Sequence, residues 1–110
     1  MLFRSSKTPV VSVIDGCAAS AGTIMSVCAS HRQMNKHAYM LIHQISSGFW
    51  GKYQEIQDDM ENCDNLMKVI REIYDEHTKI PKKELDKLLK HDLWWDADKC
   101  LSYGLIDEII

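Results

Sequence analysis

A segment of small side chains, residues 15–23, holds Ser20 and has the clearest chemical potential in the chain. A β-branched run over residues 9–14 precedes it and predicts a buried strand, and an apolar run over residues 23–29 follows it and predicts a helix. Ser20 then lies where a strand turns sharply into a helix, beside free N–H groups and the positive end of the helix dipole. A hydroxyl held there has the geometry of a nucleophile next to an oxyanion site. The alternative is a serine that only caps the helix, since serine is a favoured N-cap.

A serine hydroxyl needs a base at neutral pH, and His43 is the histidine that the sequence places best for that role. It lies at the end of an apolar run over residues 38–44, which predicts a second strand and a rigid frame for the imidazole. The alternative is a hydrogen-bonded histidine of the core or its rim. A carboxylate must also orient the imidazole. The residues alone leave Asp92 and Asp107 as nearly equal candidates, because Asp96 is explained as a helix cap.

The elements expected around Ser20 and His43 begin with the strand over residues 9–14. Its apolar character is that of a strand in a parallel sheet covered on both faces. Residues 30–37 are polar and predict a solvent-exposed loop. Residues 45–51 hold glycine, serine and two aromatic side chains, and they predict a mobile, partly extended loop.

One long helix is predicted over residues 52–79. Its apolar side chains recur at spacings of three and four, which makes a near-heptad stripe. The stripe consists of Ile56, Met60, Cys63, Met67, Ile70 and Tyr74, with Leu66 and Ile73 beside it. At about 1.5 Å per residue the helix is roughly 40 Å long, which is more than a domain of this size can cover. We therefore expect part of it to project and pack against another subunit; a helix lying wholly on its own sheet is the alternative.

The last third of the chain predicts two further helices and a terminal strand. Pro81 opens a helix that runs to residue 90, and Asp96 caps a short helix over residues 97–103. Residues 105–110 predict an apolar strand. Residues 91–95 are expected to be a connector, and its large side chains are expected in the core: Leu93, Trp94 and Trp95.

The composition is that of one soluble globular domain, with 110 residues of which 45% are hydrophobic and 26% charged. A net charge of −3 gives no reason to expect nucleic acid as a partner. The four cysteines are scattered without metal-type spacing, so we expect no metal, and they indicate reduced thiols in a cytoplasmic compartment. No apolar run is long enough to span a membrane, so we expect no membrane partner.

Three blocks, in one order, resemble the proteolytic subunit family of the Clp protease. The blocks are residues 16–22, residues 40–44, and Asp92 with residues 103–107. In that family the nucleophile lies in a G-x-A-A-S-x-G segment and the base ends a strand that reads roughly M-I-H-Q. The orienting acid precedes a hydrophobic pair and a Y-G-L-I-D segment. The resemblance covers residues 7–110, which is nearly the whole chain.

The resemblance implies an α/β, crotonase-like fold with a parallel-sheet core and a long projecting helix, in one peptidase domain over residues 1–110. It implies a triad of Ser20, His43 and Asp92, and so it selects Asp92 over Asp107. It also implies that the Ala21 N–H is an oxyanion donor and that no cofactor takes part. The substrate-binding segment that it implies contains Gln44, Ile45, Ser46 and Gly48.

The chain departs from the family at the second oxyanion donor. The family takes that donor from a glycine in an S-P-G-G segment upstream of the first strand, and this chain has no such segment. The family's early strand and helices, including those that meet the ATPase ring, have no counterpart in this sequence either. We therefore expect a fragment of a longer protein, a partner that supplies the missing part, or a chain that is not a competent enzyme. Ile45 also stands where the family usually has proline, which affects how the loop pairs with a substrate.

The leading hypothesis is a serine endopeptidase subunit that acts on peptides or unfolded proteins. The resemblance implies assembly into stacked homo-oligomeric rings, an AAA+ ATPase unfoldase as partner and a cytoplasmic location. The second hypothesis is a catalytically incomplete relative that keeps only the fold and the assembly surface. A third is a crotonase-type acyl-CoA enzyme, which leaves the Ser20, His43 and Asp92 set unexplained and lacks a basic nucleotide site.

Overall fold

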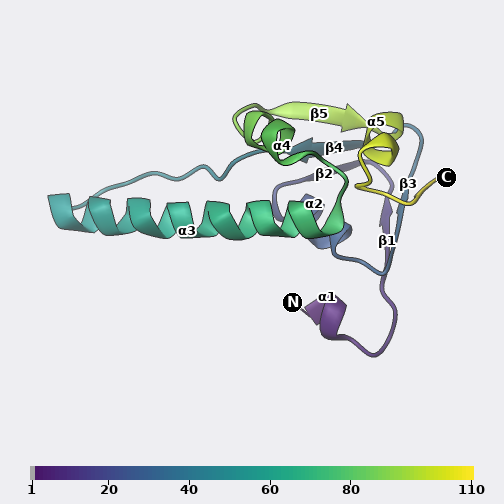
Figure 1. The fold of residues 1–110 in the computed structure, drawn as a ribbon, viewed down its shortest axis with the longest axis horizontal. Coiled ribbons are helices and arrows are strands. Elements are labelled where there is room, and N and C mark those ends of the chain that lie inside the picture. Colours follow the sequence, from purple (N-terminus) through teal and green to yellow (C-terminus); the bar gives the residue numbers. More distant parts are fainter. Residues whose placement is uncertain (1) are drawn as a thin grey trace.

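Within residues 2–110, which the computed structural model describes, short strands and helices form a mixed α/β fold (Figure 1). A first helix, α1, covers Leu2–Ser5, and a bend at residues 15–16 separates the first two strands. The strands are β1 (Val11–Ile14), β2 (Cys17–Ala19), β3 (His31–Met34), β4 (Tyr39–Ile42), β5 (Leu93–Asp96) and β6 (Glu108–Ile109). The other helices are α2 (Ala21–Val27), α3 (Tyr53–His77), α4 (Lys82–Leu88) and α5 (Ala97–Ser102).

The strands form two small sheets, each with three strands. The first has the order β1-β3-β6 and is parallel throughout, and the second has the order β2-β4-β5. In the second sheet β2 pairs parallel with β4, whereas β5 pairs antiparallel with β4. The predicted parallel-sheet core is therefore only partly correct, since one of the two sheets is mixed.

The predicted loop over residues 30–37 is wrong, because β3 lies there at the centre of the first sheet. The strand was not predicted because its side chains are polar and the prediction relied on apolar residues. These polar side chains are paired with the C-terminal segment instead: Gln33 and His31 bond to Glu108, and Arg32 bonds to Asp107. Cross-strand polar pairs of this kind stabilise a sheet without apolar side chains.

Strand β1 is covered on one face only, so the prediction of a strand buried on both faces is wrong for this chain. Val11 and Val13 are 55% and 52% exposed, whereas Ile14 is buried. Side chains alternate along a strand, and the two valines therefore share the exposed face. The apolar run predicted the strand correctly but not the number of layers packed on it.

The predicted connector over residues 91–95 is also wrong in part, because β5 begins at Leu93 and pairs along β4. Trp95 is buried in the core as expected, but Leu93 and Trp94 are about half exposed. Side chains alternate along a strand, which explains why Trp95 is buried and the neighbouring Trp94 is not. Leu93 is on the same face as Trp95 but is the first residue of the strand, and it is exposed there.

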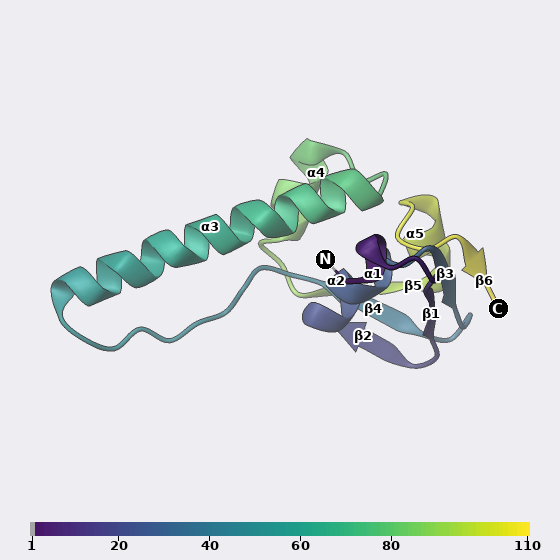
Figure 2. The same cartoon turned by 90° about the horizontal axis from the view of Figure 1, so that it is seen from below.

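Helix α3 has 25 residues and extends well beyond the sheets (Figures 1 and 2). Its C-terminal part packs on the domain: Tyr74 is buried, and Met67, Ile70 and Ile73 pack against the core. The segment between β4 and α3 reaches to the far end of the helix (Figure 2). No helix described in residues 2–110 is long and apolar enough to cross a lipid bilayer.

The short helices close the fold around α3. Pro81 lies just before α4, and the Asp96 carboxylate accepts the Lys99 N–H at 2.9 Å, which is the predicted N-cap of α5. Gly104 ends α5 with a φ of 70°, a conformation that suits glycine. A Cβ there would lie 2.8 Å from the Cγ of Lys79, so the residue also allows α5 to approach the end of α3.

Candidate active site

Ser20 alone makes the turn between β2 and α2. Its φ of 54° and ψ of −123° are unusual, and it is the one non-glycine residue with a positive φ among residues 2–110. Such a backbone costs about 1–3 kcal/mol and persists only where the surroundings hold it. The Ser20 side chain makes no capping hydrogen bond to α2. The alternative in which Ser20 serves only as a helix cap is therefore wrong.

The Ser20 hydroxyl faces the imidazole of His43. Strands β2 and β4 run parallel with Ala19 opposite Leu41, so their carboxyl ends lie at the same edge of the sheet. Ser20 follows β2 directly, and His43 follows Ile42 at the end of β4. The distance between Ser20 Oγ and His43 Nε2 is 2.6 Å. This is the contact a base needs to remove the hydroxyl proton.

Asp92 lies on the other side of the same imidazole. Its Oδ1 is 3.7 Å from Nδ1 of His43, which is an ion-pair distance and longer than a hydrogen bond. The Asp92 side chain is 80% exposed, and that of His43 is 19% exposed. The two ring nitrogens of His43 thus face a hydroxyl and a carboxylate, in the order that a nucleophile, a base and an orienting acid require.

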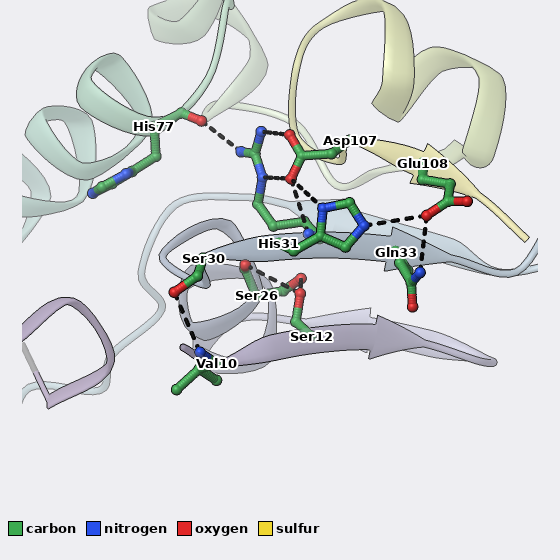
Figure 3. A network of polar contacts seen from close by, with 10 residues as sticks. Val10, Ser12, Ser26, Ser30, His31, Gln33, His77, Asp107 and Glu108 are labelled. Carbon is green, nitrogen blue, oxygen red and sulfur yellow. Dashed lines mark hydrogen bonds and ion pairs between the residues drawn. The ribbon is translucent and has the colours of Figure 1, made fainter. Parts of the chain in front are cut away.

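Asp107, the other candidate acid, belongs to a separate network of polar contacts (Figure 3). Its carboxylate is bound by Arg32. Arg32 donates from Nη2 to Oδ1 at 2.6 Å and from Nε to Oδ2 at 3.0 Å, and its backbone N–H donates to Oδ2 at 2.9 Å. These bonds lower the pKa of the Asp107 carboxyl below its ordinary value. Arg32 also donates to the carbonyl oxygen of His77, which ties the end of α3 to this cluster. Of the two candidates, Asp92 is the carboxylate beside His43.

An open cleft of about 320 Å³ lies in front of the Ser20–His43 pair. Most of the side chains predicted from the sequence line it: Ser20, Ala21, His43, Gln44, Ile45 and Ser46. Four apolar side chains complete it: Ile24, Leu41, Ile70 and Tyr74. Gly48, which was predicted to bind substrate, is exposed and does not line the cleft. Asp92 does not line it either, because it lies on the Nδ1 side of the His43 ring.

A family model described as Clp protease matches residues 2–110. The chain belongs to the Clp protease family. It is 32% identical over 107 residues to ATP-dependent Clp protease proteolytic subunit 1 of Chlamydia caviae, covering 94% of this chain and 56% of that protein. It is 28% identical over 110 residues to the ATP-dependent Clp protease proteolytic subunit of Deinococcus radiodurans, covering 98% of this chain and 54% of that protein. The chain thus spans about half the length of the curated relatives it matches, and the family predicted from the sequence is confirmed.

In this Clp protease chain, three backbone N–H groups at the cleft differ in whether they already have an acceptor. Ala21 is the first residue of α2, so its N–H has no acceptor inside the helix. The N–H of Gln44 donates to Leu89 O at 2.9 Å, and the N–H of Ile45 points to the sulfur of Met67 at 3.4 Å. These two amides hold the segment after β4 against α4 and α3, which fixes the edge of the cleft.

Sequence reasoning missed the apolar wall of the cleft in this Clp protease chain. Ile70 and Tyr74 belong to the long-helix stripe, for which the sequence predicted a role in self-association but none in the site. Ile24 lies one helical turn after Ser20, and that spacing was the available signal for it. Within residues 2–110 no three metal-ligating side chains lie close enough together to hold an ion.

Proposed function

We propose that this chain is a serine endopeptidase subunit in which Ser20 is the nucleophile, His43 the general base and Asp92 the orienting acid. The observation that carries the proposal is the 2.6 Å contact between Ser20 Oγ and His43 Nε2 on a strained turn. A serine whose backbone is strained and whose hydroxyl meets a histidine serves no obvious packing purpose. Membership of the Clp protease family supports the same reaction.

The reaction begins when Nε2 of His43 takes the hydroxyl proton and Ser20 Oγ attacks the carbonyl carbon of a peptide bond. The Ala21 N–H donates to the oxyanion that develops on the carbonyl oxygen. Protonated His43 then delivers its proton to the leaving amine, and water later attacks the acyl group on Ser20 by the same route. One oxyanion donor alone is worth about 10²–10³ in rate, so a second donor from outside these residues is part of the proposal.

The Asp92 carboxylate must move closer to Nδ1 of His43 to orient the imidazole. At 3.7 Å from Nδ1 it attracts the imidazolium but makes no hydrogen bond. Catalytic hydrogen bonds are often long in unliganded enzymes and shorten when substrate binds. Packing of a second subunit against this exposed side chain is the step that we expect to close the distance.

The substrate is a peptide with an apolar side chain next to the bond that is cut. The cleft beside Ser20 has an apolar wall from Ile24, Leu41 and Ile70, and burying a large apolar side chain there contributes about 1.5–3 kcal/mol. The N–H groups of Gln44 and Ile45 are already engaged. An extended peptide therefore pairs with the carbonyl oxygens of this segment and with Ser46.

Labelling with a serine-directed fluorophosphonate tests the proposed nucleophile. Wild-type protein is expected to carry one adduct, which mass spectrometry maps to Ser20, and Ser20→Ala is expected to carry none. Ser102→Ala is the matched control, because Ser102 is an exposed serine on α5 whose hydroxyl bonds only to its own helix at Lys99 O. Adducts that persist in Ser20→Ala, or an unlabelled wild type in an assembled sample, would contradict the proposal.

The same proposal includes assembly into a homo-oligomer through α3. Several large apolar side chains on and before the helix remain exposed: Trp50, Tyr53, Ile56, Met60, Leu66 and Val69. Large apolar side chains left exposed along one helix indicate an interaction surface, and identical chains pair most readily through the same surface. Stacked rings and an AAA+ ATPase that unfolds the substrate complete the proposed assembly, in the cytoplasm.

Light scattering tests the assembly. Met60→Glu and Leu66→Glu place a charge on side chains that are 48% and 56% exposed, and each is expected to convert the oligomer into smaller species with its helix content kept. Met67 and Ile70 are unsuitable because they pack against the core of the same chain. Glu61→Gln, in an exposed position on the same helix, is the control and is expected to leave the mass unchanged. A monodisperse wild-type monomer would reject this surface.

A subunit that assembles but does not cleave is the second candidate function. The observation that favours it is the exposed position of Asp92, with 3.7 Å between its carboxylate and His43. In that case the fluorophosphonate does not react with an assembled sample, while Met60→Glu still dissociates it. The labelling and scattering experiments together therefore separate the two functions.

A further inference from the structure

Thr23 is a buried side chain of α2 that the proposed reaction does not use. It is fully buried and follows Ser20 by three residues. Its hydroxyl lies within hydrogen-bond distance of two carbonyl oxygens on different strands, Ala18 O of β2 at 3.1 Å and Leu41 O of β4 at 3.0 Å. A threonine hydroxyl has one proton, so the two acceptors share it in a three-centre bond.

The two carbonyl groups occupy equivalent places relative to the reactive residues. Ala18 lies two residues before Ser20, and Leu41 lies two residues before His43. The ladder between β2 and β4 ends at the pair of Ala19 and Leu41. Backbone pairing therefore stops just before the two side chains that must meet, and the Thr23 hydroxyl joins the strands at that point.

We propose that Thr23 is a positioning residue that sets the separation of Ser20 Oγ and His43 Nε2. The strained turn at Ser20 needs such a constraint, because its φ of 54° persists only where neighbouring contacts hold it. Without the hydroxyl, the ends of β2 and β4 are free to move apart. A displacement of about 1 Å in a reacting pair costs about 10²-fold in rate. The effect on rate rests on the proposed peptidase function, whereas the effect on geometry does not.

Two substitutions at Thr23 separate its hydroxyl from its shape. Thr23→Val removes the hydroxyl and keeps the branched side chain, and Thr23→Ser keeps the hydroxyl. The limiting rate of Ser20 labelling by a fluorophosphonate is expected to fall about 10- to 100-fold in Thr23→Val, with probe affinity little changed. Thr23→Ser is expected to label at close to the wild-type rate. Where Thr23→Val fails to fold, Thr23→Cys replaces it, since a thiol of similar size is a weak donor.

Ser26→Ala is the matched control for the helix. Ser26 is the next buried hydroxyl of α2, and it contacts Ser12 of β1 at 3.0 Å rather than the site. Its loss is expected to affect stability but not the labelling rate. An equal drop in rate for Ser26→Ala and Thr23→Val would assign the effect to a loosened helix and overturn the positioning role.

Nitrogen-15 NMR of the His43 ring gives a readout that does not depend on activity. In wild type Nε2 contacts the Ser20 hydroxyl, and Ser20→Ala gives the resonance without that contact. Thr23→Val is expected to move the Nε2 resonance toward the Ser20→Ala value, and Thr23→Ser is expected to leave it in place. An unlabelled wild type whose resonance still depends on Thr23 would reject the peptidase and keep the positioning role. A folded Thr23→Val with an unchanged resonance would overturn the positioning role.

Discussion

Among residues 2–110, three histidines lie within ion-pair distance of a carboxylate: His31, His43 and His77. His43 and His31 make the useful comparison, because His43 also faces the Ser20 hydroxyl. His43 follows the last residue of β4, with Asp92 Oδ1 3.7 Å from its Nδ1 and Ser20 Oγ 2.6 Å from its Nε2. Its side chain is 19% exposed and its ring borders a cleft. His31 is the first residue of β3, and its side chain is more than twice as exposed as that of His43.

His31 has a carboxylate near each ring nitrogen. Asp107 Oδ2 lies 3.9 Å from Nδ1 and Glu108 Oε2 lies 3.1 Å from Nε2 (Figure 3). Arg32 takes both oxygens of the Asp107 carboxylate in short hydrogen bonds. The cluster joins β3 to the C-terminal segment and contains no hydroxyl that His31 could activate.

A histidine beside an aspartate is therefore not by itself a catalytic pair. The role of such a pair depends on what else the carboxylate and the imidazole contact. The carboxylate of Asp107 already pairs with Arg32, so it is a structural group. Asp92 pairs with His43, whose other ring nitrogen faces the hydroxyl of the strained Ser20.

The largest effect is expected from Asp92→Asn. If Asp92 fixes the tautomer of His43, the amide favours the wrong tautomer and the rate of Ser20 labelling or peptide cleavage falls about 10²- to 10⁴-fold. Asp107→Asn is expected to leave that rate close to wild type, because its carboxylate belongs to Arg32. Kinetic measurement of both variants in parallel checks the pair. The reverse ranking would give the orienting role to Asp107.

The next effect is on stability, and it comes from the Asp107 carboxylate beside His31. Asp107→Asn is expected to lower the free energy of unfolding at neutral pH by about 1–2 kcal/mol, since it weakens charge-assisted bonds to a mostly buried Arg32. Asp92→Asn is expected to change it little, because Asp92 is 80% exposed. Urea denaturation of the two variants measures both values. Equal losses in stability would mean that the two carboxylates do not differ as described.

The stabilisation from Asp107 also depends on pH with a definite sign. Hydrogen bonds from Arg32 hold the pKa of Asp107 below its ordinary value of 3.8, so the unfolded chain binds this proton more readily than the folded chain. The stabilisation is complete above that ordinary value and is lost as the pH falls below it toward the folded pKa. Unfolding of Asp107→Asn is therefore expected to depend less on pH in this acid range, and a slope equal to that of wild type would contradict the assignment.

The smallest effect tests the strain at Ser20. Glycine accepts a positive φ and alanine does not, so Ser20→Gly is expected to be more stable than Ser20→Ala by about 1 kcal/mol. Ser30, the residue before His31, has no positive φ, and there the order is expected to reverse, with Ser30→Ala more stable than Ser30→Gly. Thermal unfolding of the four variants checks both pairs. The same order at both positions would remove strain as a distinguishing feature of Ser20.

Much of the fold could be predicted from local pattern, and the misses share a physical cause. The apolar runs predicted β1 and β4, and the apolar stripe predicted a helix where α3 lies, because periodicity and cap residues are local properties. Strand β2, which leads into Ser20 in place of the strand predicted over residues 9–14, was missed because its side chains are small and were assigned to the turn. Strands β3 and β5 were missed because one is polar and the other is short and half exposed. Their stability comes from neighbours far away in the sequence, the C-terminal segment for β3 and β4 for β5.

The sequence by itself determined the family and the order in which Ser20, His43 and Asp92 occur along the chain. The family followed from the resemblance of three sequence blocks, which occur here in the same order as in the Clp protease family. Only the tertiary structure decided that the Ser20 hydroxyl meets His43 rather than its own helix, that Arg32 takes Asp107, and that α3 supplies a wall of the cleft. The reason is that distances between side chains depend on how β2, β4 and α3 pack together. No property of a single segment encodes that packing.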